Sequence, residues 1–262
     1  MKLCVDVGNT TIRLGFYENG FLRYRLIMAT DANKLEDDLY SSLEFLCRQR
    51  HIPTYNVDNI IYSSVVPNIN KELKKALEKL FTESRLINLE SCLKYYPVQM
   101  NCDNPKEVGA DIIADIVGAK SKYNLPLIIV DLGTATKLLY VDKEGIFQSA
   151  LIMPGLKISA DSLFDKAALL PEVDLENATN VSNSKNTNDC IRNGIVFGHV
   201  ESIKGLCNRF EEEVGHKVNV VVTGGAASLV LKHLPKEYLH DDSLVLDGEL
   251  ILLEKYLDEI GD

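Results

Sequence analysis

Two short stretches of this chain carry an aspartate, a glycine and hydroxyl side chains at the same spacing. The first is Asp6–Thr11 (D-V-G-N-T-T) and the second is Asp131–Thr136 (D-L-G-T-A-T). A carboxylate at the end of a strand can hold Mg²⁺, directly or through water, and a nearby glycine lets the backbone approach a phosphate. The polar residues that follow offer N–H and hydroxyl donors to phosphate oxygens. Ordinary hairpin turns also use glycine and asparagine, but the repetition favours a two-sided phosphate clamp.

A third glycine-containing motif, Thr223-Gly224-Gly225-Ala226, follows the apolar stretch Val218 to Val222. Paired glycines between a strand and a helix either let the backbone approach a flat ligand or simply close a turn. The motif is weak by itself. Its position after the two aspartate motifs favours a ligand-binding role, because the three motifs then form an ordered set.

The elements that would position the two aspartate motifs are themselves repeated. An apolar strand is expected before each one, at 3–5 and 127–130, and an alternating strand after each one, at 12–17 and 137–141. A turn signal follows in both cases. Two strand–turn–strand hairpins half a chain apart predict a duplicated domain.

Helical and strand patterns alternate between and after these hairpins, which indicates an α/β fold. Leucines at 35, 39, 43 and 46 form one apolar stripe, and a second stripe runs from Ile69 to Leu80. Further helices are expected at 111–119, 188–206 and 249–260, with strands at 59–66 and 218–222. The boundary between the halves is expected between Gly118 and Pro126, which gives lobes of residues 1–118 and 119–262.

The amino-acid composition excludes several classes of binding partner. The chain has 262 residues and a formal net charge of −10, which argues against nucleic acid or an anionic membrane as a partner. Its six cysteines include no C-x-x-C pair, so neither a zinc site nor a disulfide framework is expected. The N-terminus lacks the pattern of a signal peptide and no apolar run is long enough to span a membrane, so we expect a cytoplasmic protein.

The order of the three glycine-containing motifs resembles the phosphate-1, phosphate-2 and adenosine motifs of the acetate-kinase/sugar-kinase/Hsp70/actin superfamily. Residues 104–111 (N-P-K-E-V-G-A-D) look like a signature of the type III pantothenate kinases. Pro154-Gly155-Leu156, with Leu163 and Leu170 after it, the segment from Asn186 to Gly198, and residues 244–248 (L-V-L-D-G) are also similar to that family. The resemblance implies an α/β protein of two tandem ribonuclease-H-like, actin-like ATPase lobes, each with a mixed sheet.

The resemblance also implies an activity, a transfer of the γ-phosphoryl group of ATP to pantothenate in the first step of coenzyme A biosynthesis. It implies ATP with Mg²⁺, a monovalent cation (potassium or ammonium) and a homodimer. Asp111 would be the catalytic base and Asp131 would hold the monovalent cation. The expected ATP-binding residues are Asp6, Val7, Gly8, Asn9, Thr10, Thr11, Ile12, Arg13 and Thr134. The expected pantothenate-binding residues are Cys102, Gly109, Ala110, Asp111, Ile112 and Thr187.

The chain departs from the family pattern at four places, one of which is Ser149-Ala150 ahead of Pro154-Gly155-Leu156, where a glycine pair is usual. Ile112 stands where arginine is usual, Cys102 where tyrosine is usual, and Lys137 where threonine is usual. A lost arginine contact costs about 1.5–3 kcal/mol per charged hydrogen bond, which weakens binding without necessarily abolishing activity. Two alternatives therefore stand beside the pantothenate kinase, namely a kinase for a related hydroxyl acceptor and a catalytically impaired nucleotide-binding homologue with a regulatory role.

Overall fold

The structure is a computed structural model that describes residues 1–261. It consists of two compact units. The first comprises Met1–Gln99, Asp103–Ser121 and residues 244–261, and the second comprises Met100–Cys102 and Lys122–Ser243. Within the described residues, no helix is both long and apolar enough to cross a membrane.

The first unit is built on a five-stranded mixed sheet with the order β3-β2-β1-β4-β5. Its strands are β1 (Lys2–Val7), β2 (Thr11–Glu18), β3 (Phe21–Ala29), β4 (Asn59–Ser64) and β5 (Arg85–Asn88). Its helices are α1 (Glu36–Gln49), α2 (Pro67–Leu80), α3 (Leu89–Cys92), α4 (Ala110–Lys122) and α8 (Leu244–Ile260). Short 3₁₀ turns lie at η1 (Thr54–Asn56) and η2 (Pro105–Glu107). The first three strands are antiparallel, whereas β4 and β5 run parallel to β1.

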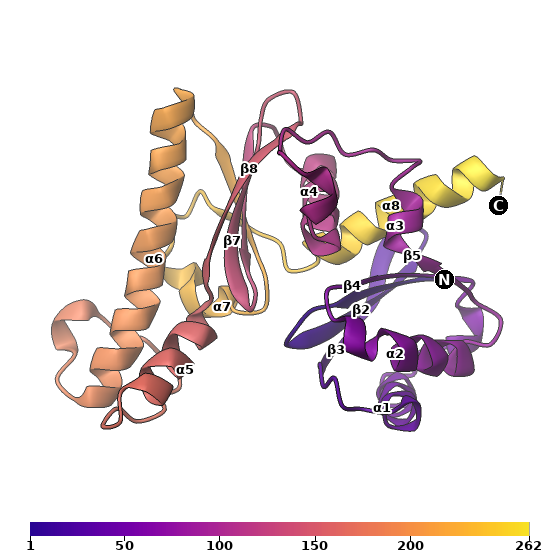
Figure 1. Ribbon diagram of the computed structural model, residues 1–262, viewed down its shortest axis with the longest axis horizontal. Coiled ribbons are helices and arrows are strands. Elements are labelled where there is room, and N and C mark those ends of the chain that lie inside the picture. Colours follow the sequence, from indigo (N-terminus) through magenta and orange to yellow (C-terminus); the bar gives the residue numbers. More distant parts are fainter. Residues whose placement is uncertain (262) are drawn as a thin grey trace. The chain divides into compact units, whose positions relative to one another are not determined.

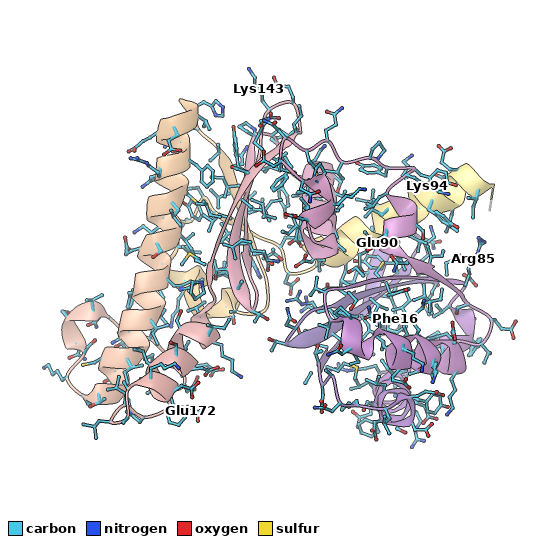
Figure 2. All side chains as sticks on the ribbon, in the orientation of Figure 1. Phe16, Arg85, Glu90, Lys94, Lys143 and Glu172 are labelled. Atoms are coloured by element: carbon cyan, nitrogen blue, oxygen red, sulfur yellow. The ribbon has the colours of Figure 1, made fainter. Side chains whose placement is uncertain are left out.

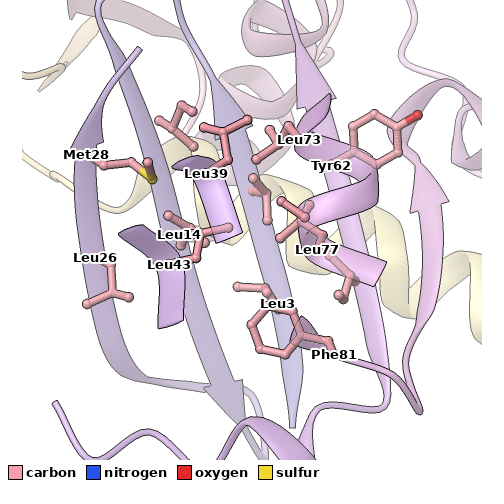
Figure 3. Packing of buried hydrophobic residues seen from close by; sticks show 14 of the residues in the cluster. Leu3, Leu14, Leu26, Met28, Leu39, Leu43, Tyr62, Leu73, Leu77 and Phe81 are labelled. Atoms are coloured by element: carbon pink, nitrogen blue, oxygen red, sulfur yellow. The ribbon is translucent and has the colours of Figure 1, made fainter. Parts of the chain in front are cut away.

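Helices α1 and α2 lie side by side against one face of this sheet (Figure 1). The apolar stripe of α1 buries Leu39 and Leu43, and that of α2 buries Leu73 and Leu77. Phe16 of β2, which is labelled in Figure 2, packs against Phe81, the residue that follows α2, and their ring centroids are 6.2 Å apart. Figure 3 shows the leucines of both helices and Phe81 packed together with side chains of the sheet. Both stripes were predicted, except that Leu35 precedes α1 and is exposed.

The second unit repeats this plan with the strand order β10-β9-β6-β7-β8. Its strands are β6 (Leu127–Leu132), β7 (Ala135–Val141), β8 (Phe147–Pro154), β9 (Asn219–Thr223) and β10 (Leu239–His240). Its helices are α5 (Leu156–Lys166), α6 (Thr187–Val214) and α7 (Ala227–Val230), with 3₁₀ turns at η3 (Val181–Asn183) and η4 (Leu231–His233). The three antiparallel strands and the parallel β9 and β10 match the first sheet strand for strand.

This equivalence confirms the duplication expected from the sequence, because hairpin β1–β2 corresponds to hairpin β6–β7. After the short segment Met100–Cys102, the chain passes from the first unit to the second between Ser121 and Lys122. The C-terminal residues differ from the expected lobe of 119–262. Helix α8 groups with the first unit because it packs on β1, β2 and β4, and it begins at Leu244, before the predicted start at 249.

Candidate functional site

Hydrogen bonds within the turn and from Thr30 fix the conformation of the first hairpin's turn. Gly8 N donates to Thr11 O at 3.0 Å, and a side chain at Gly8 would place its Cβ 3.3 Å from that same oxygen. Thr30, just after β3, braces the turn from the side: its hydroxyl donates to Gly8 O at 2.7 Å and its N–H to Thr10 O at 2.9 Å. Asn9 and Thr10 are exposed at the tip, which leaves their side chains accessible to a ligand.

Asp6 and Arg13 face each other across this hairpin. They are directly opposite in the β1–β2 register, and Arg13 Nη1 lies 3.1 Å from Asp6 Oδ2. The Asp6 side chain is only 5 % exposed and that of Arg13 is 19 % exposed. Val7 and Ile12, which we expected to contact ATP, have fully buried side chains in the core, so only their backbone groups remain for such a contact.

A buried carboxyl group that we did not predict lies beside Asp6. Glu249 of α8 is fully buried, and burial, reinforced by the negative charge of Asp6, raises the pKa of its carboxyl group well above the usual value. The buried Asp115 of α4 raises this pKa further, whereas Ser63 of β4 and Arg13 lower it. Among the described residues, neither Glu249 carboxyl oxygen has a partner in hydrogen-bonding geometry. The raised pKa favours the protonated, uncharged form of Glu249 in the folded protein.

Asp111 lies in the first turn of α4. Its Oδ1 accepts a hydrogen bond from Ile112 N at 2.9 Å, the interaction of an acidic residue with a helix N-terminus. A Cβ at Gly109 would stand 2.5 Å from this same oxygen, so a larger residue at position 109 would clash with the carboxylate in this position. We did not predict a role for Asp115, although it lies four residues after Asp111 and this i, i+4 spacing places the two carboxylates on neighbouring turns of one helix face.

Two glycines bring α4 close to α8. A Cβ at Gly248 would lie 1.9 Å from Ala114 O, and one at Gly118 would lie 2.3 Å from Leu244 O. Real atoms cannot approach so closely, so both positions require glycine. This close packing places Asp115 and Glu249 within electrostatic reach of each other, and it explains the glycine in the L-V-L-D-G motif.

The second hairpin repeats the pairing of an aspartate with a cation. Asp131 and Lys137 are directly opposite in the β6–β7 register, and Lys137 Nζ lies 2.8 Å from Asp131 Oδ2. The T-G-G-A motif packs on the same aspartate. Gly224 has a φ of +96°, and a Cβ there would be 2.6 Å from Asp131 Oδ1. The motif therefore closes over the end of β6, and Ala226 N donates to Leu132 O at 2.9 Å.

Thr134 is exposed at the turn of the second hairpin, as a phosphate-binding residue must be. The P-G-L motif supports this turn from behind, since a Cβ at Gly155 would stand 2.2 Å from Thr134 O. Further along β7, the buried Thr136 hydroxyl is 2.8 Å from His199 Nε2 of α6. Burial lowers the pKa of His199, which favours a neutral imidazole in a structural role.

Thr187 begins α6 at the rim of an open groove of about 750 Å³ in the second unit. Asn186 caps the helix by accepting from Asp189 N at 3.0 Å. Two motifs that are distant in sequence meet here, because the groove is lined by Leu163, Leu170, Lys185, Asn186, Thr187, Cys190, Ile191, Gly194 and Ile195. Its walls are largely apolar with a few polar groups, as is common in small-molecule sites.

The predicted site residues are divided between the units. Residues 6–13 and 109–112 belong to the first unit, whereas Cys102, Asp131, Thr134 and Thr187 belong to the second. Cys102 joins the second unit because the backbone before it pairs with β8: Asn101 N donates to Phe147 O at 2.8 Å. Ile112 is half-buried at the start of α4.

Comparison with known proteins decides the family. The family model described as type III pantothenate kinase matches residues 2–209. A type III pantothenate kinase of Sulfurihydrogenibium sp. (strain YO3AOP1) is 34 % identical over 256 residues, which cover 98 % of this chain and 100 % of that protein. The chain belongs to the type III pantothenate kinase family. This membership makes it a kinase, and a kinase uses ATP and a divalent metal.

Solved structures agree on the fold. A Campylobacter jejuni protein described as a candidate transcriptional activator of the Baf family superposes with a TM-score of 0.60 at 17 % identity, covering 98 % of this chain and 99 % of that one. An archaeal actin homolog gives a TM-score of 0.52 at 10 % identity, covering 97 % and 99 %. At these identities the likeness concerns the fold alone, which is that of the actin-like proteins.

The residues around Asp6 fit a divalent cation that arrives with a nucleotide. In the described part of the chain, no group of three acidic, cysteine or histidine side chains is arranged to hold a metal by itself. Mg²⁺ commonly uses one or two carboxylates together with substrate phosphates, and Asp6 supplies one carboxylate next to the exposed turn. The buried Asp115 is a further acidic group in this region, whereas the raised pKa of Glu249 favours its uncharged form.

Proposed function

We propose that this chain phosphorylates pantothenate to 4′-phosphopantothenate at the expense of ATP, the first step of coenzyme A biosynthesis. The family match over residues 2–209 carries the proposal, and the two equivalent aspartate hairpins support it. In phosphoryl transfer, the protein mostly positions the reactants and neutralises charge, so phosphate-binding turns with aspartates behind them suit the reaction.

The ATP phosphates would contact the turn from Gly8 to Thr11 in the first unit. Thr134, at the equivalent turn of the second unit, is exposed and is likewise proposed to bind ATP. Mg²⁺, when bound with the nucleotide, would neutralise charge between the β- and γ-phosphates, and Asp6 would hold it from the end of β1. Arg13 orients the Asp6 carboxylate through their 3.1 Å contact. The backbone of Val7 and Ile12 would complete the phosphate contacts.

Asp111 would act as the general base. It would accept the proton of the primary hydroxyl of pantothenate while the hydroxyl oxygen bonds to the γ-phosphorus and the bond to ADP breaks. Such a base contributes about 10²–10⁴-fold to the rate. Gly109, Ala110 and Ile112 are the neighbours of Asp111 in the chain and are proposed to bind the acceptor with it. Cys102 and Thr187 of the second unit are proposed as acceptor-binding residues on the family resemblance alone.

Substituting Asp111 by asparagine tests this role. The amide oxygen can still accept from Ile112 N, so the helix start and nucleotide binding should persist, while turnover falls by about 10²-fold or more because the amide cannot take the proton. Asp103→Asn, an exposed change in the preceding loop, is the matched control and should be neutral. Turnover of Asp111→Asn near that of the wild type would remove Asp111 from the mechanism.

We also propose a homodimer. Several large apolar side chains of β8, α5 and the following loop are exposed in the second unit, among them Ile152, Ile158, Leu163, Phe164 and Leu169. Contiguous exposed apolar surface often marks an interface between proteins. Light scattering after size exclusion measures the mass directly. A 29.2 kDa species at micromolar concentration would refute the dimer.

A regulatory homologue is the second candidate, because Ile112 removes a cation from the acceptor side. An assay of ATP consumption with and without pantothenate separates the possibilities. A pantothenate kinase consumes ATP only with pantothenate present. A kinase for another hydroxyl acceptor needs that acceptor, and a regulator binds nucleotide without turnover.

A further inference from the structure

The second aspartate hairpin already contains a cation. Lys137 Nζ lies 2.8 Å from Asp131 Oδ2, a distance typical of a charge-assisted hydrogen bond. The lysine side chain is 12 % exposed and that of Asp131 is 11 % exposed, so this is an enclosed pair and not a surface ion pair. Because the residues are directly opposite on β6 and β7, the backbone register fixes them as neighbours.

The other oxygen of Asp131 is enclosed by backbone. The Cβ position of Gly224 is only 2.6 Å from Oδ1, and that of Gly133 is 3.6 Å from it. A monovalent cation on Asp131 needs an open direction to the carboxylate and further oxygen ligands. Lys137 occupies the direction at Oδ2 and the glycine turn closes in on Oδ1, so the residues present do not fit a separate ion bound to this carboxylate.

Electrostatic repulsion also argues against a separate cation at Asp131. A metal ion beside Asp131 would lie close to the Lys137 ammonium, and two like charges repel strongly where little water screens them. In the described residues, no group of acidic side chains gathers at Asp131 that would hold a second cation. The first hairpin differs, because two further buried acidic side chains, Glu249 and Asp115, interact there with the Asp6–Arg13 pair or with each other.

We infer that the Lys137 ammonium takes the place of the potassium or ammonium ion that the family resemblance assigns to Asp131, so that turnover needs no monovalent cation. The inference rests on the proposed function for its activity readout. A tethered ammonium carries the same single charge as either ion, and it is present whatever the salt. Lys137 is three residues after the exposed Thr134, near the start of β7. Positive charge at this position would help to hold ATP phosphates.

The test compares wild type with Lys137→Thr in potassium, ammonium or choline chloride at equal ionic strength. Phosphorylated pantothenate is detected directly by mass spectrometry, which avoids coupling enzymes with cation requirements of their own. Wild type should turn over equally in all three salts. Lys137→Thr should lose about tenfold or more in choline, the loss of one charged contact, and should recover in potassium or ammonium.

Lys143→Thr is the matched control. Lys143 stands at the tip of the β7–β8 turn with a side chain that is 72 % exposed, and this variant should behave like wild type (Figure 2). Wild-type turnover that requires potassium would overturn the inference. So would a Lys137→Thr enzyme that is equally active in choline and in potassium.

Thermal unfolding provides a readout that does not depend on catalysis. A ligand that binds only the folded state raises the Tm with its concentration, so potassium should stabilise Lys137→Thr above the choline reference and leave wild type unchanged. If wild type phosphorylates no pantothenate in any salt, the proposed function fails and this measurement alone decides the role of Lys137. Potassium stabilisation of wild type, or none of the variant, would then overturn the inference.

Discussion

Replacing Glu249 by glutamine should make the protein less sensitive to alkaline pH. Glu249 is fully buried beside Asp6, and burial followed by the charge of Asp6 raises the pKa of its carboxyl group well above the usual value. The native protein therefore keeps this proton over a pH range in which the unfolded chain has lost it. Glutamine has nearly the same shape and carries no charge at any pH, so it removes this single difference.

The sign follows from proton linkage. When the native state binds one more proton than the unfolded state, the free energy of unfolding falls as pH rises. The slope is about 1.4 kcal/mol per pH unit for one proton, and it extends from the usual pKa of glutamate up to the raised folded pKa. In a protein of this size the slope corresponds to roughly 3–6 °C in Tm per pH unit.

The assay is thermal unfolding of wild type and Glu249→Gln between pH 5 and 8 at constant ionic strength. The two proteins should unfold at similar temperatures near pH 5, and the variant should become progressively more stable than wild type as pH rises. Other titrating groups are common to both proteins and cancel in the difference. Glu259→Gln on the exposed end of α8 is the control and should follow wild type. A difference in Tm that stays constant from pH 5 to 8 would refute the reasoning.

Two further predictions concern the acceptor side and the packing of α4. Ile112→Arg should lower KM for pantothenate about tenfold or more with a smaller change in kcat, because it restores a charged contact made in the ground state, and adding Cys102→Tyr should lower KM further. Steady-state kinetics test this, and an unchanged KM in the double variant would contradict it. Gly248→Ala should destabilise the fold by about 1–3 kcal/mol or more in urea unfolding, since its Cβ would lie 1.9 Å from Ala114 O. Gly205→Ala, where nothing lies within 4 Å, should instead stabilise α6 by about 0.5–1 kcal/mol, and equal effects of the two changes would contradict the steric argument.

Much of the fold followed from local patterns. The apolar stripes of α1 and α2 recur with a helical period, and the hairpin strands alternate with a period of two. These elements could therefore be predicted as helices and strands from local sequence alone. The duplication followed from the repeated D-x-G turns, and the sheet orders confirm it. Element ends were less predictable: α6 continues to Val214, where Gly215 with a φ of +74° ends it, well beyond the expected 206.

The sequence by itself determined the ordered set of phosphate-type turns, the family and the identity of the residues that depart from it, because these depend on residue type and spacing alone. Only the tertiary structure decided where charges meet. The β6–β7 register turned Lys137 from an unplaced departure into the partner of Asp131. The packing of α8 brought Glu249 from the far end of the chain to the buried side of Asp6. Such encounters depend on burial and on contacts between distant segments, and no local pattern in the sequence encodes either of them.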